Sequence, residues 1–134
     1  MPVDRRTLLI GSALGSAAAL SSAASAAPPP EEPKIVHHVF FWLKRPGSTA
    51  DRDQLIAGLR TLAKIPVIQS LQIGVPAPTE KRDVVDASYD VSELMVFSNV
   101  ADQKIYQDHP IHGEFIAKCA HLWDKVVVYD MVTV

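Results

Sequence analysis

The sequence predicts an α+β fold of the ferredoxin-like type, with the element order β-α-β-β-α-β. Strand-forming runs alternate with segments of helical periodicity, and the second and third of these runs follow each other with no helix between them. The first and the last of the strand-forming runs are apolar at both sets of alternating positions, so both faces of each strand are apolar. Of the 134 residues, those after residue 26 are enough for one domain with a modest core.

The N-terminal segment, residues 1–26, has the features of a twin-arginine export signal. Arg5 and Arg6 precede a weakly apolar run, and residues 24–26 have the small-x-small form of a signal-peptidase site. An uncleaved membrane anchor is the alternative, but Ala, Gly and Ser contribute little transfer free energy and a proline run follows at once. We therefore expect export to the periplasm or another extracytoplasmic compartment, with no stable membrane insertion after cleavage.

Composition limits the partners of the remaining chain. Residues 27–33 are rich in Pro and Glu and predict an extended linker, so the folded domain is expected at residues 34–134. Loss of residues 1–26 removes two arginines and one aspartate, which changes the net charge from −2 to −3 and gives no basis for nucleic-acid binding. Cys119 is the single cysteine, and its apolar neighbours predict a buried residue rather than a nucleophile.

The first strand is predicted from residue 35 to residue 43, because this run is rich in β-branched and aromatic residues. The sequence Arg45-Pro46-Gly47 ends it. Ser48 or Thr49 can then cap a helix, whose apolar residues keep the helical period until Pro66 stops it.

A hairpin follows this helix. The second strand is predicted at residues 67–75, where apolar and polar residues alternate, and the third at residues 88–97. Between them, residues 76–87 are charged and contain prolines, which predicts a long hairpin loop.

The second helical region is predicted as two helices. Asn99 caps a short helix, and Pro110 begins another because its fixed φ angle suits the first helical position. His109 is then the N-cap of the new helix and His112 lies in its first turn. The last strand is predicted at residues 125–132.

Both faces of the first strand are apolar: Val39 and Phe41 point to one side, and Phe40 and Trp42 to the other. Helices of a ferredoxin-like fold cover one face of the sheet, so in a monomer the second face would be a large exposed apolar patch. The simplest solution is a homodimer, in which two sheets face each other and form a dimeric α/β barrel.

The segment from Tyr106 to His112 is the strongest candidate for acid–base chemistry. At a helix N-terminus the positive end of the dipole disfavours the imidazolium, so His112 should be a neutral base near pH 7. Tyr106 is placed to donate a hydrogen bond to a substrate oxygen. A capping histidine and a tyrosine that closes a helix are also ordinary architecture, so the pattern leaves both interpretations open.

The other histidines give weaker signals. His37 and His38 point to opposite sides of a strand, and His37 is the one in phase with the predicted core, either as a ligand-binding residue or as a hydrogen-bonded core histidine. His109 is a second predicted ligand-binding residue. His109 and His112 match no strong metal signature, so we expect no metal and no cofactor, although His112 would be the first candidate ligand of a bound haem.

Several motifs follow one another in a set order and spacing, and they span residues 36–44, 62–66, Gly74, 89–90, 106–112 with Phe115, and 126–130. Together they resemble the stress-responsive dimeric A/B-barrel (Dabb) family from about Lys34 to the C-terminus. The resemblance implies a ferredoxin-like subunit, a homodimer with a central barrel, and a hydrophobic cavity in each subunit.

The resemblance implies two functions. Most members are described only as stress-related. Together with the export signal and the two apolar strand faces, this favours an exported homodimer whose cavity holds a small apolar ligand, with no catalysis assumed. One plant member is a polyketide cyclase, whose catalytic His and Tyr fall on His112 and Tyr106, whereas a further His of that cyclase is replaced by Val91. A cyclase- or isomerase-like enzyme, with His112 as base and Tyr106 as acid or oxyanion donor, is therefore the alternative.

Overall fold

The computed structural model describes residues 11–20 and 27–134, and the chain divides into two units, residues 1–30 and 31–134. The arginine pair and the predicted cleavage site lie outside the described residues, so the export signal stays a prediction. Within the first unit, the described residues are exposed and form neither helix nor strand. No helix in the described part of the chain is both long enough and apolar enough to span a membrane.

The second unit has the predicted order of elements. Its strands are β1 (Ile35–Leu43), β2 (Ser70–Gly74), β3 (Val91–Phe97) and β4 (Trp123–Val132). Its helices are α1 (Thr49–Thr61), α2 (Val100–Asp108) and α3 (Pro110–Cys119), and two short 3₁₀ segments follow α1 and α3 at Leu62–Lys64 and Ala120–Leu122. The ferredoxin-like α+β class is confirmed.

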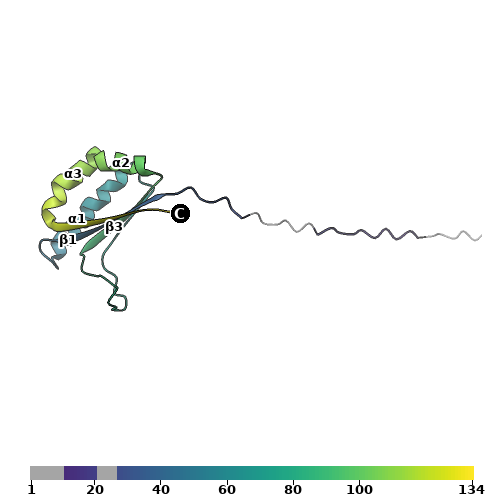
Figure 1. Cartoon of the computed structure of the whole chain (residues 1–134), viewed down its shortest axis with the longest axis horizontal. Coiled ribbons are helices and arrows are strands. Elements are labelled where there is room, and N and C mark those ends of the chain that lie inside the picture. Colours follow the sequence, from purple (N-terminus) through teal and green to yellow (C-terminus); the bar gives the residue numbers. More distant parts are fainter. Residues whose placement is uncertain (1–10, 21–26) are drawn as a thin grey trace, which may run out of the picture. The chain divides into compact units, whose positions relative to one another are not determined.

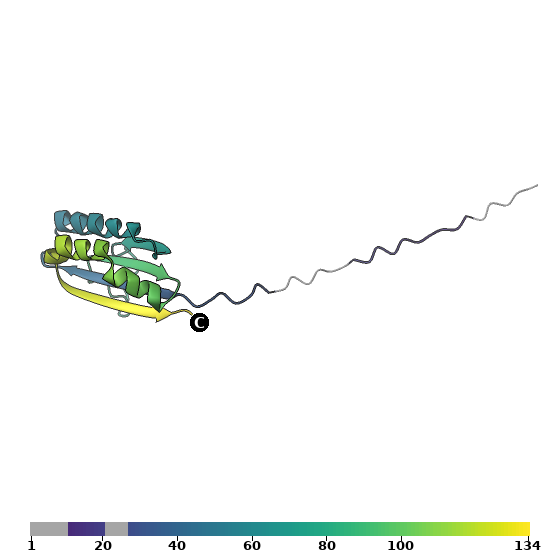
Figure 2. The same ribbon diagram turned by 90° about the horizontal axis from the view of Figure 1, so that it is seen from above.

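The strands form one antiparallel sheet in the order β2-β3-β1-β4. The helices lie on one side of this sheet (Figure 1), and α1 runs beside α3 (Figure 2). In the central pair of strands, odd-numbered residues face the helices and are buried, whereas even-numbered residues face the opposite side. The core therefore lies in a single layer between sheet and helices.

The predicted helix starts are confirmed by hydrogen bonds. The Ser48 and Asn99 side chains each accept a hydrogen bond from the backbone N–H three residues later, at 3.2 Å and 2.8 Å. His109 Nδ1 accepts from the backbone N–H of Ile111 at 3.1 Å, and Pro110 occupies the first position of α3. This last cap ends α2 and begins α3 in a new direction.

β2 and β3 each begin three residues later than predicted. The residues before β3 instead make side-chain hydrogen bonds to the end of β1: the Ser88 hydroxyl accepts from Trp42 Nε1 at 3.0 Å, and the Asp90 carboxylate accepts from the Leu43 N–H at 2.8 Å. Polar residues near a strand end compete with the strand's own hydrogen-bond ladder in this way. β4 begins two residues earlier than predicted, at Trp123.

The face of the sheet away from the helices is the predicted second apolar face. Phe40 lies near its centre, with its ring centroid 5.0 Å from that of Tyr89 and 5.9 Å from that of Tyr129. Tyr129 and Met131 are 66% and 57% exposed. No helix of the described residues covers this face (Figure 1).

α1 and α3 approach each other closely at Gly58, where an added Cβ would overlap Cys119 Sγ and lie 3.3 Å from the Phe115 ring. We expect Gly58→Ala to lower the free energy of unfolding by about 1–2 kcal/mol, because overpacking outweighs the gain of about 1 kcal/mol in helix propensity. Cys119 is buried, as predicted.

A double-mutant cycle in chemical denaturation checks this prediction. Cys119→Ala removes the overlapping sulfur, so Gly58→Ala should cost little in that background. Additive effects of the two substitutions would show that the close approach is not the cause.

Candidate functional site

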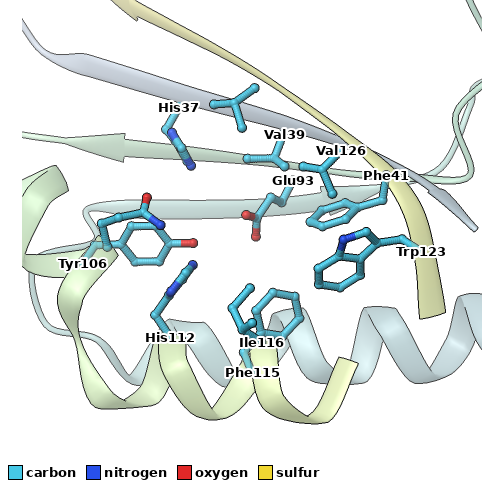
Figure 3. Close-up of a pocket in the computed structure, with 12 residues that line it drawn as sticks. His37, Val39, Phe41, Glu93, Tyr106, His112, Phe115, Ile116, Trp123 and Val126 are labelled. Carbon is cyan, nitrogen blue, oxygen red and sulfur yellow. The ribbon is translucent and has the colours of Figure 1, made fainter. Parts of the chain in front are cut away.

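A cavity of about 190 Å³ lies between the sheet and the helices α2 and α3 (Figure 3). Its polar lining residues are His37, Glu93, Tyr106, Gln107 and His112. The rest of its wall is apolar and consists of Val39, Phe41, Phe115, Ile116, Trp123, Val126 and Val128. Pockets for drug-sized ligands measure roughly 300–1,000 Å³, so this cavity fits a smaller molecule.

The break between α2 and α3 brings Tyr106 and His112 together. In one unbroken helix, residues six positions apart would point about 120° away from each other. Because Pro110 starts a new helix, the two rings instead meet edge to face, with centroids 4.9 Å apart. Figure 3 shows both side chains pointing into the same cavity.

The environment of His112 favours the neutral imidazole. Burial lowers the pKa of His112, and positive charge on His37 acts in the same direction. At neutral pH the ring is therefore able to accept a proton. The sequence predicted a neutral base from the helix dipole alone, and the structure adds burial as a second cause.

Tyr106 is held as a hydrogen-bond donor. It is 1% exposed, and burial raises the pKa of its phenol, with the negative charge of a Glu93 carboxylate acting in the same direction. The hydroxyl therefore keeps its proton at neutral pH. In Figure 3 it points toward the centre of the cavity, between His37 and His112.

His37 faces the cavity, as its phase in the strand predicted, and it is 5% exposed. Its Nδ1 lies 2.5 Å from the carboxylate of Asp130, which stands directly opposite it on β4. This contact fixes the orientation of the ring and places its other nitrogen away from Asp130. His37 is therefore a hydrogen-bonded core residue that also lines the cavity, and its ligand-binding role stays a prediction.

Glu93 is the cavity residue that sequence reasoning missed. It is 2% exposed, and Oε2 has no hydrogen-bond partner among the described residues. Burial raises the pKa of Glu93 to about 8, although the neighbouring Tyr106 hydroxyl acts in the opposite direction. The signal was present in the strand pattern, because Glu93 shares the phase of Val91 and Met95 and so falls in the buried register.

His109 is not brought into the cavity. Its Nδ1 accepts the capping hydrogen bond at the start of α3, and it is absent from the cavity lining. Three of the four predicted site residues, namely His37, Tyr106 and His112, thus lie together. Across residues 11–20 and 27–134, no group of three or more His, Cys, Asp or Glu side chains is arranged to hold a metal ion.

Comparisons with known proteins agree with this fold. The family model described as "Stress responsive A/B Barrel Domain" matches residues 35–133. A Dabb family protein with a ferredoxin-like fold from Mesorhizobium loti has a TM-score of 0.62 and 22% identity, with 76% of this chain and 98% of that chain covered. No curated protein matches the sequence significantly.

Two further solved structures are similar. A dimeric ferredoxin-like protein of unknown function from Thermobifida fusca has a TM-score of 0.61 and 20% identity, with 80% of this chain and 97% of that chain covered. A hydroxynitrile lyase from Passiflora edulis has a TM-score of 0.63 and 25% identity, with 78% and 95% covered. Proteins of this architecture thus include both a dimer of unknown function and an enzyme.

Proposed function

The chain belongs to the stress-responsive A/B barrel domain family, and on that premise we propose that it is a homodimer that binds a small, mainly apolar molecule in each subunit. The observation that carries this proposal is the cavity, an apolar space with a few convergent polar groups, which is the usual composition of a small-molecule site. The arginine pair and small-residue motif of residues 1–26 support an extracytoplasmic location.

The face of the sheet that no helix of the described residues covers supports the homodimer. Phe40, Tyr129 and Met131 form part of an apolar surface that a second copy of the chain would shield from water. Similar structures from Thermobifida fusca and Bacteroides fragilis are dimeric ferredoxin-like proteins. The cavity lies on the opposite side of the sheet, so dimerisation through this face leaves it inside each subunit.

Native mass spectrometry of protein purified from its own compartment tests both parts of the proposal. The expected result is the mass of two chains, with one small molecule retained per chain. A monomer at micromolar concentration would contradict the assembly, and a ligand-free dimer that binds none of a panel of small aromatic compounds would contradict the binding role.

A second candidate function is an acid–base enzyme of the isomerase, cyclase or lyase type. It is favoured by the shared cavity of His112 and Tyr106 and by their opposite protonation preferences. His112 would take a proton from a carbon next to a carbonyl, the electron pair would move onto the oxygen, and the Tyr106 hydroxyl would stabilise that oxygen by a hydrogen bond. The hydroxynitrile lyase from Passiflora edulis supports an enzymatic use of this fold.

Exchange of the benzylic protons of phenylacetone in D₂O, followed by proton NMR, tests this chemistry. We expect wild-type protein to accelerate the exchange and His112→Gln to slow it about 100-fold, because the base is lost. Tyr106→Phe should also slow it about 100-fold, because one oxyanion donor is lost. Because burial lowers the pKa of His112 and its neutral form is required, the rate should fall only at a pH below the ordinary titration range of a histidine.

The exposed His121 supplies the matched control. His121→Gln makes the same chemical change outside the cavity and should leave the exchange rate unchanged. Wild-type protein that exchanges no faster than buffer would exclude this candidate. A loss of folding in His112→Gln, seen by circular dichroism, would instead show a structural role for His112.

A further inference from the structure

We propose that Glu93 selects the ligand of the cavity: its neutral carboxyl donates a hydrogen bond to an oxygen of an uncharged carbonyl or hydroxyl compound, and the site rejects carboxylates. This inference rests on the proposed binding function and names the chemical class of its ligand. Glu93 lies outside the motifs that the chain shares with the family, and its side chain is buried beside the cavity.

The Glu93 side chain is buried with one oxygen unsatisfied. It is 2% exposed and Oε2 has no hydrogen-bond partner in the described part of the chain. The residues directly opposite Glu93 are Val39 on β1 and Ile73 on β2. Both are apolar, so neither offers a side-chain hydrogen-bond partner to the carboxyl. A buried polar group without a partner is costly, and an occupant of the cavity is the remaining group that can satisfy it.

The surroundings of Glu93 favour the protonated carboxyl. The titratable groups that face the cavity are His37 from β1, Tyr106 from α2 and His112 from α3. His37 is already bound to Asp130, and burial disfavours the charged form of His112. The wall contributed by β4 is apolar. Burial accordingly raises the pKa of Glu93 to about 8, and a protonated carboxyl offers one O–H donor.

The Tyr106 hydroxyl lies beside Glu93 (Figure 3) and donates a hydrogen bond to its carboxyl, whereas Oε2 has no partner among the described residues. One free O–H donor in an apolar cavity matches a carbonyl or hydroxyl oxygen, which accepts it. A carboxylate ligand would instead bring a charge into a cavity that no Lys or Arg of the described residues lines, and an unpaired buried charge is strongly disfavoured. The polar end of the cavity is therefore suited to uncharged oxygen compounds.

Three probes of similar size test this selection: acetophenone, isopropylbenzene and benzoate. Their affinities are measured at pH 7 by NMR chemical-shift titration of the purified wild-type protein and of Glu93→Leu and Glu93→Gln. We expect wild type to bind acetophenone about tenfold more tightly than isopropylbenzene, and benzoate most weakly. Glu93→Leu should lose about tenfold in acetophenone affinity without losing isopropylbenzene, whereas Glu93→Gln should keep acetophenone because its amide still donates.

The outcomes separate this inference from the proposed function. If Glu93→Leu binds acetophenone as tightly as wild type does, the role of Glu93 is overturned while binding in the cavity stands. If no probe shifts the resonances of cavity residues in wild type, the binding function itself fails. A Glu93 carboxyl carbon that titrates near pH 4.5 in carbon-13 NMR would overturn the inference independently of any ligand.

Discussion

Replacing Glu93 by Gln is expected to remove most of the loss of stability that the wild-type protein shows as pH rises from about 6.5 to 8. The folded protein holds the proton of Glu93 up to about pH 8, whereas the unfolded chain releases it near 4.5. In between, the folded state binds the extra proton, so the free energy of unfolding falls by up to about 1.4 kcal/mol per pH unit. Above about pH 8 both states are ionised and the loss is complete.

Between pH 4.5 and about pH 8, the free energy of unfolding should fall by an amount on the order of 4–5 kcal/mol in total, because the carboxyl is almost fully buried. His38 and His112 act in the opposite direction below about pH 6.5, since burial lowers their pKa values and the unfolded state then binds more protons. The range from 6.5 to 8 therefore reports on Glu93 most directly.

Urea denaturation at a series of pH values measures this effect. Glu114→Gln removes one exposed carboxylate from α3 and controls for the change in net charge. It should keep the wild-type slope, whereas Glu93→Gln should flatten it. If the free energy of unfolding falls equally steeply with pH in wild type and in Glu93→Gln, Glu93 is ionised in the folded protein. This result would contradict the protonated carboxyl.

Phe40→Asp is expected to dissociate the proposed homodimer. Phe40 lies on the apolar face away from the helices, against the rings of His38, Tyr89 and Tyr129. Because a two-fold interface contains each residue twice, the substitution would bury two unpaired carboxylates. We expect the dimer Kd to rise at least about 10³-fold, to be measured by analytical ultracentrifugation.

Ile105→Asp is the matched control for this substitution. Ile105 is 50% exposed on α2, on the helical side of the sheet, so its change should leave the assembly intact. Phe40→Asp should keep the secondary structure of the wild type by circular dichroism. A variant that stays dimeric would show that the two chains meet through a different surface.

The fold and part of the site could be predicted because their signals are local. The side chains of the N-caps Ser48, Asn99 and His109 accept hydrogen bonds from backbone N–H groups at most three residues away. Pro110 sets the break between α2 and α3 that brings Tyr106 and His112 together. These contacts depend on short segments of chain, which a sequence displays directly.

The remaining site features depend on distant pairings. Asp130 meets His37 across 93 positions of sequence, and only the register of β1 against β4 brings the two together. One carboxyl oxygen of Glu93 lacks a hydrogen-bond partner among the described residues, because the residues opposite Glu93 on both neighbouring strands are apolar. Predicting this would require the register of three strands. The ligand-binding role predicted for His109 gained no support, because its ring nitrogen satisfies the backbone of α3 instead.

Successive side chains of β1 point to opposite faces of the sheet, so its odd positions line the cavity and its even positions lie on the outward face. His37, Val39 and Phe41 line the internal cavity, while His38 and Phe40 belong to the outward surface. A one-residue insertion in the middle of β1 would exchange the two sets beyond that point, sending cavity residues outward and surface residues inward. Substitutions, by contrast, can alter one face of β1 without the other, so the proposed ligand binding and the proposed self-association could change independently of each other.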